Sequence, residues 1–272
     1  MTIRGLPLPS PRPGLLAAAL LLLSAWARAD FAVAISPPRF ELQARPGTVL
    51  RQTMEVTNAS ARPGTYRVRT ADWTYAQDGT VEFVDDLAPG SCRPWVALER
   101  RELKVGSGRA YRFRFEVAPP ADAPAGECRF AIMVEGQQEQ ANNGSLTVPF
   151  NARVAVIVYL AVGDAQPKLS IVGSTVQVLN GQRLPALRVR NDGNAHGRLG
   201  GFLQGGDAAA TRLEFTPATS PILPGETRAI ALLPSRPGDP DGAVTLRFPV
   251  TVKGRVDWGR DASQDIDLQF AP

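Results

Sequence analysis

The chain alternates between apolar and polar residues with a period of two over much of its length. In residues 110–117 apolar and charged side chains alternate, and residues 50–56 and 128–134 show a similar pattern. Alternation of this kind is typical of strands with one buried face. After position 29, no window of 11 or more residues shows an apolar stripe with the period of a helix. The pattern predicts an all-β protein, with these residues facing its core: Leu50, Met54, Val56, Tyr111, Phe113, Phe115, Val117, Cys128, Phe130, Ile132 and Val134.

Turn-forming pairs separate the predicted strands, among them Pro63-Gly64, Asp78-Gly79 and Pro89-Gly90. Short strands between such turns are typical of a sandwich of the immunoglobulin type. Residues 163–167 have the composition of a linker, and a second set of strands is predicted beyond them. We therefore predict two tandem immunoglobulin-like β-sandwich domains, residues 30–163 and 164–272. The strands predicted for the second domain are 168–172, 186–191, 198–203, 228–233, 244–252 and 266–270.

One alternating segment is too long for an ordinary sandwich strand. It runs without a break from Leu146 to Val162 and would extend about 56 Å at roughly 3.3 Å per residue. Either its edge is open for a partner chain, or it is a bent core strand that continues into a hydrophobic hinge. Pro149 has no N–H to donate, which favours an edge strand. The residues predicted on its apolar face are Leu146, Val148, Phe150, Ala152, Val154, Val156, Val158, Leu160 and Val162.

Residues 1–29 have the three parts of a secretory signal peptide. Arg4 and Arg12 form the charged start, residues 15–26 the apolar part, and Ala27-Arg28-Ala29 a small-residue cleavage site. We predict export with cleavage after Ala29. The alternative, an uncleaved membrane anchor, is disfavoured because the apolar run is short. Loss of three arginines lowers the formal net charge from +4 to +1, which leaves no basic excess for a nucleic-acid partner.

The inventory of one histidine and two cysteines limits the available chemistry. Zinc centres need several His or Cys ligands, so we expect neither a metal site nor a cofactor. Because an exported protein meets an oxidising compartment, Cys92 and Cys128 are predicted to form a structural disulfide. The alternative is a pair of free, buried thiols.

Catalysis would require a nucleophile with a base, or paired carboxylates in a pocket. His196 lies in a polar turn, where a structural or solvent-exposed role is expected, and Asp85-Asp86 has the composition of a hairpin turn. We therefore predict a protein that is not an enzyme and has no small-molecule substrate.

The order of local motifs resembles that of the periplasmic pilus chaperones of the chaperone–usher pathway, the PapD-like family. The likeness covers nearly the whole chain after the signal peptide and places this sequence as a divergent member. The motifs, in chain order, are Ile35-Ser-Pro-Pro-Arg39-Phe, Val56-Thr-Asn-Ala-Ser60, Trp95, Leu103-Lys-Val-Gly106 before the Tyr111 strand, residues 120–126 leading into Cys128–Val134, and the segment 146–162.

The resemblance implies a periplasmic chaperone that lends a strand to a pilin-like subunit and delivers the subunit to an outer-membrane usher. By position, Leu146, Val148 and Phe150 would be donated, followed by Ala152 and Val154. The family holds the subunit's terminal carboxylate with an Arg and a Lys, but this chain has Pro37 and Ala155 at those places.

Arg39 and Arg153 lie two residues away on the same strand faces and could bind the carboxylate instead; they could also be solvated surface charges. The family's Leu-Phe-Tyr-Arg-Pro run is replaced by Val156-Ile-Val-Tyr-Leu160. A different class of function also fits the sequence, namely a secreted immunoglobulin-like adhesive or scaffold protein that has no client to fold.

Overall fold

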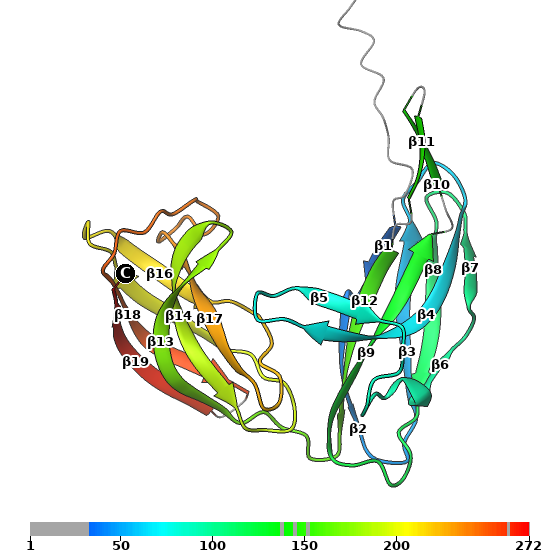
Figure 1. Cartoon of the computed structure of the whole chain (residues 1–272), viewed down its shortest axis with the longest axis horizontal. Coiled ribbons are helices and arrows are strands. Elements are labelled where there is room, and N and C mark those ends of the chain that lie inside the picture. Colours follow the sequence, from blue (N-terminus) through cyan, green and yellow to red (C-terminus); the bar gives the residue numbers. More distant parts are fainter. Residues whose placement is uncertain (1–32, 137–138, 144–145, 151–152, 260–261, 272) are drawn as a thin grey trace, which may run out of the picture.

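The computed structural model describes residues 33–136, 139–143, 146–150, 153–259 and 262–271, with the backbone alone for 139–143 and 146–150. The described strands form two β-sandwiches, one within residues 33–162 and one within residues 169–270 (Figure 1). The prediction of an all-β chain with two immunoglobulin-like sandwiches is confirmed. The predicted boundary at residues 163/164 stays a prediction, and the predicted signal peptide, residues 1–29, lies outside the described residues. No helix in the described part of the chain is long and apolar enough to span a membrane.

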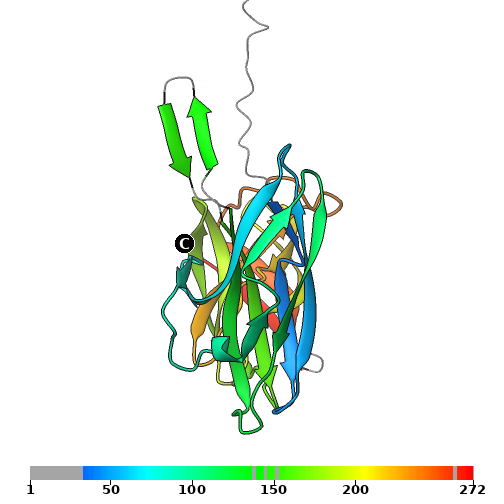
Figure 2. The same ribbon diagram turned by 90° about the vertical axis from the view of Figure 1, so that its right-hand side faces the viewer.

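The first sandwich contains two main sheets that face each other. One has the strand order β1-β3-β8-β6, and the other has the order β2-β12-β9-β4-β5, with β7 also paired to β4. Strands β10 and β11 form a separate two-stranded sheet that projects beyond the body of the domain (Figures 1 and 2). The bounds are β1 (Val33–Ser36), β2 (Arg39–Ala44), β3 (Leu50–Asn58), β4 (Gly64–Tyr75), β5 (Val81–Val84), β6 (Val96–Leu98), β7 (Glu102–Val105), β8 (Ala110–Val117), β9 (Gly126–Gly136), β10 (Glu139–Asn143), β11 (Leu146–Phe150) and β12 (Arg153–Val162), with a short 3-10 helix at Arg93–Trp95.

The chain changes from one sheet to the other at Pro37 and Pro38, between β1 and β2. Before Pro37 and Pro38 the chain pairs with β3, and after them it pairs in parallel with β12. Proline has no N–H for a strand ladder, so the pair ends one pairing and allows the other to begin. This switch decides how much of β12 has a neighbour.

Side chains predicted to face inward form the core of the first sandwich. Phe113, Phe115, Phe130 and Ile132 are fully buried, and Phe40 packs edge-on against Phe115 with ring centroids 5.2 Å apart. Strand β9 is also buried on its other face, through residues such as Met133. That second apolar face lies toward the other sandwich.

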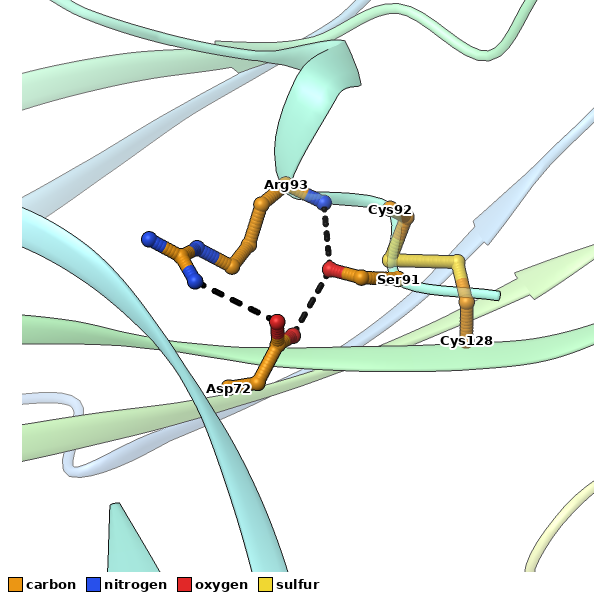
Figure 3. The surroundings of a disulfide bond; sticks show 5 residues. All are labelled: Asp72, Ser91, Cys92, Arg93 and Cys128. Carbon is orange, nitrogen blue, oxygen red and sulfur yellow. Dashed lines mark hydrogen bonds and ion pairs between the residues drawn. A yellow bond between two sulfur atoms is a disulfide. The ribbon is translucent and has the colours of Figure 1, made fainter. Parts of the chain in front are cut away.

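The predicted disulfide is present between Cys92 and Cys128, whose Cα atoms are 5.7 Å apart. It ties the turn before the 3-10 helix to β9 (Figure 3). Beside it, Asp72 accepts hydrogen bonds from the Ser91 hydroxyl at 2.7 Å and from the Arg93 guanidinium at 3.2 Å. Covalent and ionic links therefore hold the same turn.

The second sandwich has the strand order β13-β14-β17-β16-β15-β18-β19. Its core contains Leu187, Leu203, Phe215 and Leu232, all fully buried. The bounds are β13 (Leu169–Leu179), β14 (Gln182–Asn191), β15 (Gly200–Gly206), β16 (Arg212–Pro217), β17 (Thr227–Ser235), β18 (Val250–Trp258) and β19 (Ala262–Phe270).

One predicted strand of this domain was misplaced. Residues 244–252 were expected to be extended throughout, but β18 begins only at Val250. Pro249, the residue before this start, has no N–H to donate to a neighbouring strand, so the pairing of β18 begins after it.

Candidate functional site

The alternating segment 146–162 forms two strands in the structure. Strand β11 covers Leu146–Phe150 and β12 covers Arg153–Val162, while residues 151 and 152 lie outside the described part of the chain. Strand β11 is paired to β10 and β12 is built into the sandwich, and whether the expected strand continues through residues 151 and 152 stays a prediction. Ala152 cannot be placed, and the side chains of Leu146, Val148 and Phe150 are not described.

The outer edge of β12 is paired over only part of its length. Its inner edge pairs with β9 from Arg153 to Val162, but its pairing with β2 starts at Ile157. Among the described residues, Arg153–Val156 therefore have a strand neighbour on one side only. Strand β11 likewise has a single described neighbour, β10. An open strand edge of this kind offers unpaired N–H and C=O groups to another chain.

The alternation predicted for β12 is present in its burial pattern. Val156, Val158, Leu160 and Val162 belong to the core of the sandwich, and Val154 is half-buried. The C-terminal half of the segment therefore behaves as the core strand of the alternative interpretation. The described parts of the segment with an open outer edge are Leu146–Phe150 and Arg153–Val156.

The two arginines proposed for a carboxylate lie on one sheet face but not side by side. Arg39 is opposite Ile157 in the parallel register, four residues along β12 from Arg153, which corresponds to about 13 Å. Arg39 bonds to Glu41 at 2.9 Å and its side chain is half exposed; Arg153 is exposed at the start of β12. Whether either contacts a ligand stays a prediction.

A third arginine on this face was missed by the sequence reasoning. Arg129 stands opposite Tyr159 in the β9–β12 register and stacks its guanidinium over the Trp73 ring at 5.2 Å. One of its terminal nitrogens is buried without an acceptor among the described residues. A buried donor without a partner is uncommon in native proteins and can mark the place of a ligand or a water molecule. The alternating charge pattern of β9 contained this residue but did not distinguish it.

The two sandwiches meet around His196, the only histidine of the chain. Its Nδ1 lies 2.5 Å from a Glu127 carboxylate oxygen, its Nε2 lies 2.6 Å from an Arg198 nitrogen, and its ring lies 4.0 Å from the Tyr159 ring. Because Arg198 can only donate, Nε2 accepts and Nδ1 donates to Glu127. Arg198 also donates to Glu41 at 2.6 Å. The expected structural role for His196 is thus that of a contact between domains.

A second contact joins the domains at the tip of the β4–β5 hairpin. Arg228 of β17, with a side chain only 3% exposed, donates to the carbonyls of Tyr75, Ala76 and Gln77 at 2.9–3.3 Å. Its guanidinium lies 4.2 Å from the Tyr75 ring centroid. A planar fork of donors suits several carbonyls at once, so this arginine fixes the hairpin against the second sandwich.

No protein-family model matches this chain, and no curated protein matches it. Solved structures of similar fold include the class 5 fimbriae chaperone CfaA, with 13% identity over 89% of this chain and 100% of that chain and a TM-score of 0.48. Others are the E. coli chaperone DraB (14% identity, 88% and 99%, TM-score 0.43) and a chain of the Salmonella enterica complex between the SafA pilin and the SafB chaperone (12%, 88% and 97%, TM-score 0.46). At this identity the likeness is one of fold.

Proposed function

We propose that this protein is an exported, periplasmic chaperone that binds a pilin-like pilus or fimbrial subunit by strand pairing and delivers it to an outer-membrane usher. The role is not enzymatic. The observation that carries the proposal is the open outer edge of β11 and of Arg153–Val156, which have one described strand neighbour each. A subunit that lacks a strand can pair its own main chain with such an edge.

Apolar side chains at alternate positions would add affinity to this main-chain pairing. Leu146, Val148 and Phe150 recur with the period of a strand, on a ribbon that projects beyond the sandwich (Figures 1 and 2). Each apolar side chain that moves from water into a groove contributes about 1.5–3 kcal/mol. A slip of one residue would turn all of them away from the groove, so the same pattern also specifies register.

The proposed carboxylate site lies on the β2-β12-β9 face that is turned toward the second sandwich. Arg39 remains a candidate there, and its ion pair with the half-exposed Glu41 is of the kind that exchanges readily. Arg129 is a stronger companion for it than Arg153, because a buried guanidinium nitrogen without an acceptor gains most from a carboxylate. Arg39 and Arg129 would together bind the terminal carboxylate of the subunit and fix its register.

The alternative role, a secreted adhesive or scaffold protein, predicts a segment 146–162 that is fully paired within the molecule. The edge of β12 does not favour it, because no second strand among the described residues pairs with Arg153–Val156.

The proposal is tested with Phe150→Glu in co-expression with a strand-deficient pilin-like subunit. A charge at an apolar position of the donated strand is expensive to bury, so we expect the variant to fold normally and to lose the subunit in co-purification. If Arg39 or Arg153 holds the carboxylate, Arg39→Ala/Arg153→Ala should weaken capture of the subunit. If Arg129 holds it, Arg129→Gln should weaken capture.

The matched control is Thr147→Glu, which adds the same charge at the intervening position of the same strand. It should retain the subunit. If Phe150→Glu unfolds the isolated protein, or if both glutamate variants capture the subunit as well as the unchanged chain does, the proposed role is wrong.

A further inference from the structure

A second gap in strand pairing lies in the first sandwich, away from β11 and β12. Strand β4 pairs along one edge with β7 through Gly64–Arg67 and with β5 through Asp72–Tyr75, which leaves residues 68–71 between them without a strand on that side. Strand β6 is the edge strand of the opposite sheet. The chain crosses from β6 to β7 at this point, on the side of the domain that faces away from the second sandwich (Figure 1). The two sheets therefore separate here.

A pocket of about 580 Å³ fills the gap between the two strand edges. It is open to solvent, and its volume falls within the range of ligand-binding clefts. Residues of β4 and β6 line it together with four arginines, which are Arg67, Arg69, Arg93 and Arg101. A concentration of guanidinium groups in one cleft selects for anionic ligands.

Two of the four arginines are neutralised within the protein. Arg69 bonds to Glu135 at 2.7 Å and pairs with Asp85, and the hydrogen bond to Glu135 raises the pKa of Arg69 above its usual range. Arg93 bonds to Asp72 and to the Thr70 carbonyl. Their side chains are 20% and 16% exposed, so they form a fixed wall of the pocket.

The other two arginines carry the unbalanced charge. Arg67 on β4 and Arg101 just before β7 are exposed, and neither has an ion pair or side-chain hydrogen bond within the described part of the chain. They lie near each other, because the carbonyl of Arg101 accepts the N–H of Val68 at 2.8 Å. The guanidinium groups of Arg67 and Arg101 can therefore each bind one carboxylate, and the two carboxylates can belong to neighbouring parts of one ligand.

We propose that this pocket binds an extended acidic segment of a protein partner. Aspartate or glutamate side chains of the segment bind Arg67 and Arg101, and its main chain lies along the open edge of β6 at Val96–Leu98. The pocket is too large for a lone small anion, and a strand edge favours a peptide over a compact ligand. The site shares no residue with the proposed subunit surface, so its success or failure is independent of the chaperone role.

The test uses fluorescence anisotropy with the full-length protein and a labelled peptide of alternating Asp and Ser. We expect saturable binding that weakens with salt, and at least about tenfold weaker binding to Arg67→Gln/Arg101→Gln because two charge-assisted bonds are lost. The control variant Arg109→Gln/Arg112→Gln removes the same charge from exposed positions of the same domain outside the pocket and should bind normally.

Two further probes separate the possible causes. A peptide of alternating Asn and Ser should not bind, and inorganic phosphate should compete only weakly. Equal losses in both double variants would mean attraction to the general charge of the domain and would overturn the proposal. So would phosphate binding in the absence of peptide binding, which would assign the pocket to a small oxyanion.

Discussion

At the scale of single residues, the turn that carries Cys92 depends on a buried carboxylate. Asp72 is only 5% exposed, and it accepts a hydrogen bond from the Ala88 N–H. It also accepts bonds from the Ser91 hydroxyl and from Arg93 (Figure 3). Removing one member of a buried ion pair leaves the other charge without compensation. This role could not be predicted from the sequence, because an aspartate within an alternating strand normally faces solvent.

We therefore expect Asp72→Ala to lower the free energy of unfolding by about 3 kcal/mol, measured by urea denaturation with the disulfide intact. Asp241→Ala, at an exposed loop position, should change it by no more than about 0.5 kcal/mol. A loss of less than about 1 kcal/mol for Asp72→Ala would show that water reaches the pair and compensates Arg93.

At the scale of strands, the alternation of apolar and polar residues predicted which face of a strand is buried better than it predicted where the strand begins and ends. The expected segment 110–117 is β8 with its apolar side chains inside, because one buried face is a local property of the pattern. The change of sheet at Pro37 depends on which strands become neighbours, and alternation does not encode this. Strand β16 was overlooked although Leu213 and Phe215 alternate with polar residues, since the segment is short.

The candidate site could likewise be predicted only in part from the sequence. The segment 146–162 was recognised from its unbroken alternation, and the structure leaves the edge of its first part open. Tyr159 and Arg198 were not recognised, because their contact forms only where two domains separated in sequence come together. Arg129 was not recognised, because its contact with Trp73 joins strands distant in sequence. His196 was assigned to a polar turn, and its stacking partner is on the other sandwich.

The β4–β5 hairpin shows how one residue can fix an element from another domain. Replacing Arg228 with methionine keeps apolar volume beside Tyr75 but leaves the hairpin carbonyls without their charged donor. We expect Arg228→Met to raise the amide hydrogen exchange of Ala76 and Gly79, whose N–H groups close the turn, by about tenfold or more. Arg228→Lys keeps the charge without the planar fork and should give an intermediate rate. Unchanged exchange in the methionine variant would mean that the hairpin holds its own shape.

At the scale of the whole molecule, Tyr159 belongs to one of the two contacts described between the sandwiches. Burial raises the pKa of the Tyr159 phenol above its ordinary value, and the Glu127 carboxylate raises it further against the opposing effect of Arg198, Arg129 and Arg39. Below about pH 10 the phenol is neutral in the folded and the unfolded chain alike, so it has no influence on the pH dependence there. Above that pH the unfolded chain releases the proton while the folded chain retains it. Stability therefore falls as the pH rises toward the raised pKa.

The least costly response to an ionised Tyr159 is separation of the domains, since water then reaches the phenolate and Glu127 while both sandwich cores stay intact. We expect the radius of gyration from small-angle X-ray scattering to increase only above about pH 10, with little loss of the circular dichroism of the strands. Tyr159→Phe should suppress the increase. The pKa of Tyr111 is also raised, chiefly by its hydrogen bond to Glu99, but that residue lies away from the contact, so Tyr111→Phe should leave the expansion unchanged. An expansion that persists in Tyr159→Phe would place the alkaline weak point elsewhere, whereas its selective loss would show that one tyrosine couples the domain angle to proton binding.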